Sequence, residues 1–245
     1  MQLQFIGCGD AFGSGGRFNT CFHVTGKRAN FLIDCGASSL VALKRAGIDR
    51  NGVDLILITH FHADHFGGIP FFILDAQFFA KRTRPLTIAG PRGLTDWYIR
   101  AMETAFPGSS KTKQKFELSL IELAPGQVWR RENIEVLPAL VRHGPPDVPF
   151  HAYRVSVEDR IIAYTGDTEW TETLIEIGRD ADLFIAESYF YEKNAPLHLS
   201  YKTLAEKLPL IRPKRVVLTH MNDDMLARKE GVEFERAEDG KTIVL

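Results

Sequence analysis

The sequence predicts an α/β protein in which strands and helices are mixed from end to end. Short runs rich in β-branched and aromatic residues alternate with helical patterns over all 245 residues. No low-complexity linker divides the chain, and its Pro/Gly-rich stretches, residues 7–16 and 143–149, are short. We therefore expect residues 1–245 to form a single domain with polar loops at the ends of its strands.

The expected strands are short apolar runs followed by polar or turn-forming residues. They lie at residues 3–7, 21–25, 30–34, 54–60, 86–90, 133–141, 151–157, 160–167, 182–188 and 214–220. The expected helices show helical spacing of apolar residues, and the first has serines at its start and a glycine at its end. They lie at residues 38–47, 67–82 and 201–211. Residues 54–65 and 214–225 are alike, since a strand ends in Thr-His and acidic residues follow, which is weak support for two similar halves.

Composition places the chain among soluble globular proteins and narrows its partners. Hydrophobic residues make up 44% of the chain, charged residues make up 25%, and the formal net charge is -1. A nearly neutral chain has no overall electrostatic bias toward nucleic acid or an anionic membrane. Two basic segments, residues 80–84 and 111–115, are interpreted as solvated loops, and their role stays open.

The cysteines and the N-terminus favour a cytoplasmic protein without a membrane partner. Cys8, Cys21 and Cys35 form an odd set without CxxC spacing, which indicates buried reduced thiols rather than disulfides. The N-terminal residues lack the basic start and apolar core of a signal peptide. No apolar run reaches the length of a membrane span.

A cluster of metal-ligand residue types follows the expected strand at residues 54–60. The stretch LITHFHADHFGG places His60, His62, Asp64 and His65 directly after an apolar run. Burying three imidazoles and a carboxylate without a cation would be costly. Exposing them would not explain the apolar strand and helix on either side. The sequence therefore predicts a metal site here.

Three further residues of the same types follow other expected strands. His143 comes after ALVR, Asp167 after IIAYTG, and His220 after RVVLT. Strand ends of one sheet converge at one edge, where α/β folds bind ligands. Imidazoles and carboxylates gathered there suit Zn, Mn or Fe. His23 and His151 are instead interpreted as hydrogen-bonded structural residues.

Together these residues resemble the metallo-β-lactamase superfamily. THFHADH matches its HxHxDH signature, and His143, Asp167 and His220 fall where its remaining ligands lie. The opening FIGCGDAFGSGGRFNT is similar to the start of the branch that contains ribonuclease Z and related phosphodiesterases. In FLIDCG, the resemblance implies that Asp34 supports the ligands. It covers nearly the whole chain and implies a four-layer αββα sandwich, in which two mixed sheets are flanked by helices.

The resemblance also implies that seven residues hold two divalent ions. One ion would be held by His60, His62 and His143, the other by Asp64, His65 and His220, with Asp167 bridging. Seven ligands are too many for one tetrahedral zinc. They suit two ions about 3.5–4 Å apart that share a carboxylate and a hydroxide, which would be the nucleophile at neutral pH. We expect Zn, although Mn or Fe would accept these ligands, and Asp64 would also orient the hydroxide.

The segment between the last two ligands bears on the reaction. FIAESYFYEKNAPLHLS resembles the part of the ribonuclease Z and phosphodiesterase branch where a glutamate precedes a histidine, here Glu187 and His198. In that branch the histidine lies near the leaving group or phosphate, and the glutamate holds it. An alkoxide leaving group needs a proton, so this pair suits a phosphodiesterase. The expected catalytic residues are therefore Asp64, Glu187 and His198.

The chain length between two ligands favours small substrates. Bacterial ribonuclease Z carries a tRNA-binding arm between the equivalents of His143 and Asp167, whereas here 24 positions allow only two strands and a turn. We expect small cyclic or linear phosphodiesters as substrates, and nucleic acid is not favoured. The alternatives are a tRNA 3′-processing endoribonuclease, a lactonase or thioesterase of the same superfamily that would not need His198, and a non-enzymatic accessory binding protein.

The helical segment 67–82 is rich in large apolar side chains, namely Phe71, Phe72, Leu74, Phe78 and Phe79. Such a run usually packs in a core. More apolar surface than one helix face can bury would suit a subunit interface, so a homodimer is a hypothesis for this chain.

Overall fold

Two seven-stranded sheets face each other in the computed structural model, which describes residues 1–245. The first sheet has the order β14-β1-β2-β3-β4-β5-β6, and its pairs from β3 to β6 are parallel. Its strands are β1 (Gln2–Gly7), β2 (Cys21–Thr25), β3 (Asn30–Ile33), β4 (Leu55–Leu57), β5 (Leu86–Gly90), β6 (Leu118–Glu122) and β14 (Thr242–Val244).

The second sheet has the order β13-β12-β11-β10-β9-β8-β7 and is also mixed. Strands β7 to β10 pair antiparallel, and β10 to β13 pair parallel. Its strands are β7 (Trp129–Arg131), β8 (Ile134–Val141), β9 (Phe150–Val157), β10 (Arg160–Tyr164), β11 (Leu183–Glu187), β12 (Val216–Thr219) and β13 (Glu235–Arg236). Strands β4 and β12, the two Thr-His strands, therefore lie in different sheets.

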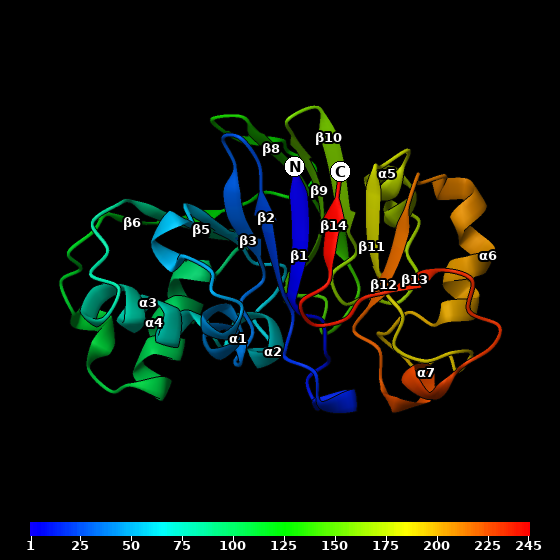
Figure 1. Ribbon diagram of the computed structural model, residues 1–245, viewed down its shortest axis with the longest axis horizontal. Coiled ribbons are helices and arrows are strands. Elements are labelled where there is room, and N and C mark those ends of the chain that lie inside the picture. The colour runs from blue at the N-terminus through cyan, green and yellow to red at the C-terminus, as the bar shows by residue number, and fades with distance from the viewer.

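Helices cover the outer face of each sheet, so that the layers run helix, sheet, sheet, helix (Figure 1). The helices are α1 (Ser39–Arg45), α2 (Ala63–Phe66), α3 (Ile69–Phe78), α4 (Leu94–Ala105), α5 (Thr173–Gly178), α6 (Tyr201–Ile211) and α7 (Asp223–Ala227). Short 3-10 turns are η1 (Ser14–Gly16), η2 (Arg50–Gly52) and η3 (Ser109–Lys111). None of the helices has the length and apolar character to cross a membrane.

The core between the sheets fixes how they meet. Alternate residues of β1, β2, β8, β9 and β10 point inward and form one apolar cluster from both sheets. Within this cluster the ring of Phe22 packs edge-on against Phe5 of its own sheet and Tyr164 of the other, and the ring centroids are 5.0 Å apart in each pair. Each buried side chain of this size stabilises the fold by about 1.5–3 kcal/mol. The predicted four-layer αββα sandwich is confirmed.

Most predicted elements lie within a residue or two of the observed ones, but not all. The strand predicted at residues 54–60 ends at Leu57, because the backbone N–H of Thr59 turns to the carboxylate of Asp34 at 2.8 Å. The elements that were not predicted are helices α2, α4, α5 and α7 and strands β6, β7, β13 and β14. Of these, α4 and β6 carry mixed polar and apolar residues, and they pack against α3 and β5.

Arg82 corrects the interpretation of residues 80–84 as a solvated loop. Its side chain is only 1% exposed, although no carboxylate pairs with it. The guanidinium lies over the ring of Phe116 and donates hydrogen bonds only to backbone carbonyls. These carbonyls are those of Arg84, Arg50, Asn51, Val53 and Pro85, at 2.6–3.3 Å. Arg82 therefore ties the turns before β4 and β5 together.

Replacing this guanidinium should destabilise the fold. Arg82→Ala leaves several carbonyls without donors, and each such buried group costs about 1–3 kcal/mol. We expect the free energy of unfolding to fall by about 3 kcal/mol or more in urea denaturation. Arg84→Ala is the matched control, because that side chain is 61% exposed and its pair with Asp54 is worth at most about 1 kcal/mol. Equal stability of the two variants would contradict the bridging role of Arg82.

Candidate active site

The seven predicted metal-ligand residues lie together at one end of the two sheets. Residues 60–65 follow β4 of the first sheet. His143 follows β8, Asp167 follows β10 and His220 follows β12, all in the second sheet. Both Asp34 and His220 have left-handed backbones, with φ of 59° and 54°. Such conformations are uncommon for residues other than glycine and cluster at functional sites.

Three histidines form the first group. His60 Nε2 lies 3.1 Å from His62 Nδ1, which lies 3.2 Å from His143 Nε2. Ring nitrogens face one another here, and imidazoles that approach so closely through nitrogen can share either a proton or a cation. The three atoms lie within 4.8 Å of one another and could hold one ion. His62 is exposed, so this group opens to solvent.

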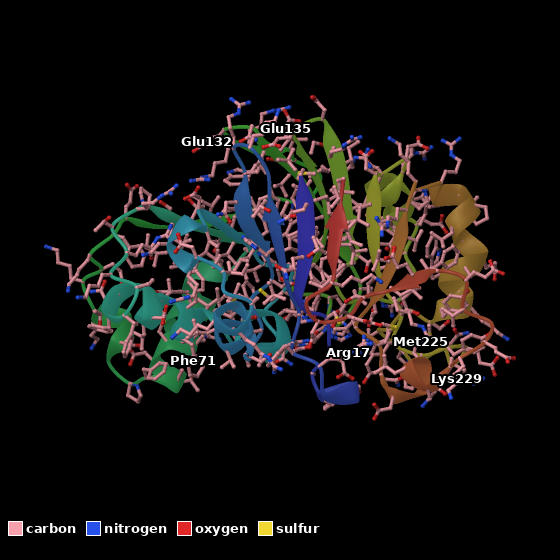
Figure 2. All side chains as sticks on the ribbon, viewed as in Figure 1. Arg17, Phe71, Glu132, Glu135, Met225 and Lys229 are labelled. Carbon is pink, nitrogen blue, oxygen red and sulfur yellow. The ribbon has the colours of Figure 1, made fainter.

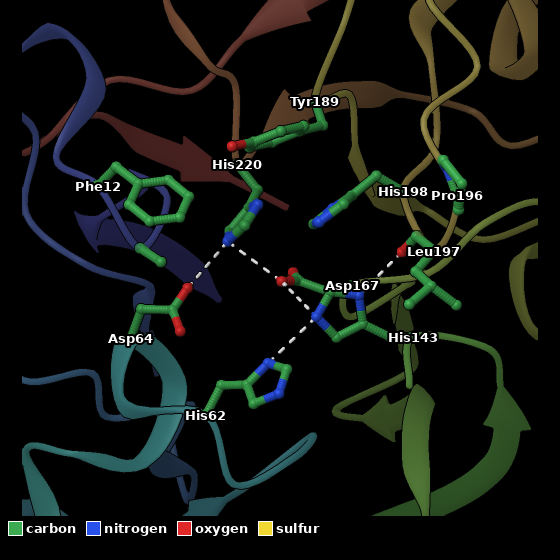
Figure 3. Close-up of a pocket in the computed structure, with 11 residues that line it drawn as sticks. Phe12, His62, Asp64, His143, Asp167, Tyr189, Pro196, Leu197, His198 and His220 are labelled. Atoms are coloured by element: carbon green, nitrogen blue, oxygen red, sulfur yellow. Dashed lines mark hydrogen bonds and ion pairs between the residues drawn. The ribbon is translucent and has the colours of Figure 1, made fainter. Parts of the chain in front are cut away.

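The second group contains the two carboxylates and the remaining histidines. His220 Nε2 lies 3.1 Å from Asp64 Oδ2 and 3.2 Å from Asp167 Oδ2. His65 Nε2 lies 3.3 Å from each of the same two oxygens. Asp167 Oδ2 is also 3.5 Å from His143 Nε2, so this oxygen lies between the two groups (Figure 3).

Neighbouring residues hold the imidazoles in place. His65 Nδ1 contacts Asp34 Oδ2 at 2.8 Å, and Asp34 also accepts from the backbone and hydroxyl of Thr59. His143 Nδ1 contacts the carbonyl oxygen of Leu197 at 2.8 Å. A hydrogen bond at one ring nitrogen fixes the tautomer of the imidazole and leaves the other ring nitrogen available to a metal. Phe150 packs against the rings of His60, His62 and His143.

The electrostatics of the buried group call for added positive charge. Burial lowers the pKa of the His60 imidazole, which therefore stays neutral. For His220 burial also lowers the pKa, but the carboxylates of Asp167 and Asp64 outweigh it and raise the pKa to about 10. The proton on His220 thus supplies positive charge where a bound cation would otherwise supply it. The buried Oδ1 of Asp167 has no hydrogen-bond partner. The donor set fits two divalent ions.

Glu187 and His198 lie beside these groups. Glu187 is fully buried at the end of β11, and its Oε1 accepts a hydrogen bond from His198 Nδ1. Its Oε2 accepts from the backbone N–H groups of Thr168 and Leu199, at 2.7 and 3.3 Å. Burial lowers the pKa of His198, but the Glu187 carboxylate outweighs it and raises that pKa.

A cavity of about 300 Å³ opens over the site. Figure 3 shows His62 across the site from His198 and His220, while His143 lies against His198 with ring centroids 4.8 Å apart. Sequence reasoning missed five residues that line the cavity: Ala11, Phe12, Tyr189, Pro196 and Leu197. Its place two positions after Glu187, an expected catalytic residue, is a weak signal for Tyr189, whereas nothing in the sequence indicates the others.

His23 and His151, interpreted from the sequence as structural, lie outside the two groups of candidate metal ligands, which we call the metal-type groups. His23 Nε2 contacts the side-chain oxygen of Asn30 at 2.7 Å. His151 is 1% exposed, and burial lowers its pKa to about 4. Its Nδ1 is 3.4 Å from the hydroxyl of Tyr153, which donates to the carbonyl of Ile58.

The double sheet and the paired groups at its edge define a metal-dependent hydrolase of the metallo-β-lactamase fold. The chain belongs to the family of the anti-Pycsar protein Apyc1, whose sequence model matches residues 1–240. It is 26% identical to ribonuclease Z of Geobacillus kaustophilus, over 91% of this chain and 88% of that protein. That alignment spans 277 positions, more than the 245 residues of this chain, so the relative carries insertions.

Solved structures share the fold over their full length. Human tRNase Z, short form (ELAC1), has a TM-score of 0.81 at 24% identity and covers 100% of this chain and 99% of its own. The metallo-beta-lactamase fold protein YhfI from Bacillus subtilis has a TM-score of 0.78 at 20% identity, with 99% of each chain covered. These structural likenesses show the fold.

The metal content of the purified protein tests the assignment of ligands. We expect two divalent ions per chain by elemental analysis, and a lower melting temperature after treatment with a chelator, because bound ions stabilise the folded state. Asp167→Ala should lose at least one ion, since its oxygen lies between both groups. His23→Ala, outside the site, should keep both. Two ions retained by Asp167→Ala would contradict a bridging role.

Proposed function

We propose that this protein is a dinuclear metal-dependent phosphodiesterase that acts on small cyclic or linear phosphodiesters. The observation that carries the proposal is the His198–Glu187 pair, which faces the same cavity as both metal-type groups. A thioesterase releases a weakly basic thiolate and needs no proton donor in that place. A diester with an alkoxide leaving group does.

The ligands divide between two ions as their geometry suggests. His60, His62 and His143 would hold one ion, and Asp64, His65 and His220 the other, with Asp167 between them. Two divalent ions bound there supply an ionised water for attack at phosphorus and positive charge for the phosphoryl oxygens. Zinc suits the group of three histidines best, and Mn or Fe would also accept these donors.

The side chains of this chain would move the remaining proton. As the ester P–O bond breaks, the departing oxygen takes a proton from Nε2 of His198. Glu187 holds Nδ1 of that ring and balances the positive charge of the protonated form. Asp64, which lines the cavity and contacts His220 through Oδ2, would orient the attacking water. The loss of one proton from His198 matches the gain of one by the leaving alcohol.

Small substrates are supported by the loop lengths around the cavity. Between His143 and Asp167 the chain holds only a short loop, β9, a turn at Glu158 and Asp159, and β10. No segment in this interval extends from the fold as a tRNA-binding arm would. A cavity of about 300 Å³ suits a molecule of mononucleotide size.

A second candidate, tRNA 3′ processing, is favoured by the ribonuclease Z relatives. It would require RNA contacts outside the cavity. The exposed lysines of residues 111–115 offer positive charge for such contacts. We rank this candidate second because the inserted segments of the relatives have no counterpart in this chain.

His198→Ala tests the proposed reaction. With both ions bound, the wild-type protein should hydrolyse members of a panel of ribonucleoside 3′,5′-cyclic phosphates. The variant should lose about 10²–10⁴-fold in kcat on them, because general acid catalysis contributes that much. Equal activity of variant and wild type would remove the role of His198. Turnover of pre-tRNA alone would favour the second candidate, and no phosphodiester turnover at all would overturn the proposal.

We also propose that the protein forms a homodimer through α3 and its surroundings. Phe72 of α3 is buried, but Phe71, Phe78 and Phe79 are 42%, 55% and 79% exposed. Phe71 lies at the surface on the α3–α4 side of the molecule (Figure 2). Exposed aromatic side chains clustered on one helix are typical of an interface. Light scattering should give twice the 27.6 kDa chain mass, and a monomer mass at all concentrations would contradict the dimer.

Two further expectations belong with this proposal. Residues 1–245 would act as one hydrolase domain, because the ligands of each proposed site lie on both sheets. A cytoplasmic location would suit the three cysteines, which are all free and buried.

A further inference from the structure

Tyr189 makes a specific contact with the proposed proton donor. Its ring stacks on the imidazole of His198, with centroids 4.3 Å apart and planes 21° from parallel. Both rings line the cavity, and Figure 3 shows Tyr189 beside His198 and next to His220. The imidazole also meets the ring of His143 edge-on at 4.8 Å, and the nearly parallel ring of His220 lies 6.2 Å away.

The loop that carries His198 does not by itself fix the imidazole. Residues 191–199 contain no helix or strand, and the His198 side chain is 24% exposed. Its only side-chain hydrogen bond joins Nδ1 to Glu187. A single bond holds one atom, so the ring could still turn about that bond and move Nε2 away from the cavity.

The tyrosine, in contrast, stands on a fixed backbone. Its N–H donates to the carbonyl of Leu199 at 2.9 Å, and its own carbonyl accepts from the N–H of Asn222 at 3.1 Å. These bonds join the segment after β11 to the His198 loop and to the start of α7. The ring is therefore a rigid surface against which the imidazole can lie.

We infer that Tyr189 is a positioning residue that holds the plane of the His198 imidazole, so that Nε2 faces the leaving group. The inference rests on the proposed role of His198. The hydrogen bond to Glu187 fixes one atom, the stack fixes the plane, and the two together fix the ring. The aromatic face of Tyr189 carries this role, and its hydroxyl has none.

Leaving groups of different basicity separate this role from a general structural one. A strongly basic ribose alkoxide needs the proton from His198, whereas the weakly basic p-nitrophenolate leaves without it. Kinetics should therefore be measured on the cyclic-nucleotide panel and on bis(p-nitrophenyl) phosphate, with metal content and melting temperature recorded for each variant.

Tyr189→Ala should lower kcat on cyclic nucleotides by about 10–100-fold, the cost of a misplaced catalytic group. On bis(p-nitrophenyl) phosphate the loss should stay within about threefold, because that leaving group needs little help from an acid. Tyr189→Phe keeps the stack and should recover most of the loss, while Tyr189→Leu should not. In the double variant with His198→Ala, the Tyr189 change should add nothing further.

Tyr191→Ala is the matched control for loosening of the loop. Tyr191 lies two residues further on and stacks on Tyr201, away from the cavity. Any loss in this variant should be the same for both leaving groups.

Three results would overturn the inference: an equal loss on both substrates in Tyr189→Ala, no loss on either, or a loss in Tyr189→Phe as large as in Tyr189→Ala. If His198→Ala itself shows no dependence on the leaving group, the proposed role of His198 fails instead, and if the wild type turns over no phosphodiester, the proposed function fails. These failures are therefore distinguishable.

Discussion

The packing of the two sheets is the constraint on which the site depends. Four of the seven proposed ligands follow β4 in one sheet, and the other three end strands of the second sheet. Neither sheet alone brings together either group. The aromatic contacts from Phe5 through Phe22 to Tyr164 fix the spacing of the sheets, and Asp167 follows the strand that ends at Tyr164. The burial of apolar side chains in the core thus holds the two sheets together and thereby positions the polar groups at their edge.

That placement is costly unless the charges are balanced. Asp34, Asp64, Asp167 and Glu187 are all buried within contact distance of histidines. Histidine protons can balance part of this charge, and divalent ions would balance more of it with directed bonds. Left-handed backbones at Asp34 and His220 add local strain. The edge of the sandwich is therefore locally unfavourable, and the burial of the three apolar clusters offsets this cost.

The sequence predicted what lies in contiguous patterns. His60 to His65 are neighbours in the chain, and strand-end positions pointed to His143, Asp167 and His220. Arg82 was misread because a basic residue between polar neighbours looks solvated, and only the fold shows the carbonyls around it. The stack of Tyr189 on His198 was out of reach for a similar reason. It depends on the path of an irregular loop, which local propensity does not determine.

Glu187 connects the two halves of the proposed chemistry. Its Oε1 contacts His198 Nδ1 and lies 3.6 Å from Nδ1 of His220, a proposed metal ligand. One buried carboxylate therefore holds the ring that would give up a proton and lies beside a ring that would hold an ion. Because backbone N–H groups fix the other oxygen of Glu187, the carboxylate that holds His198 Nδ1 is itself held in place. In the proposed reaction, a diester would therefore lie with its leaving oxygen toward Nε2 of His198, the ring nitrogen that Glu187 leaves free.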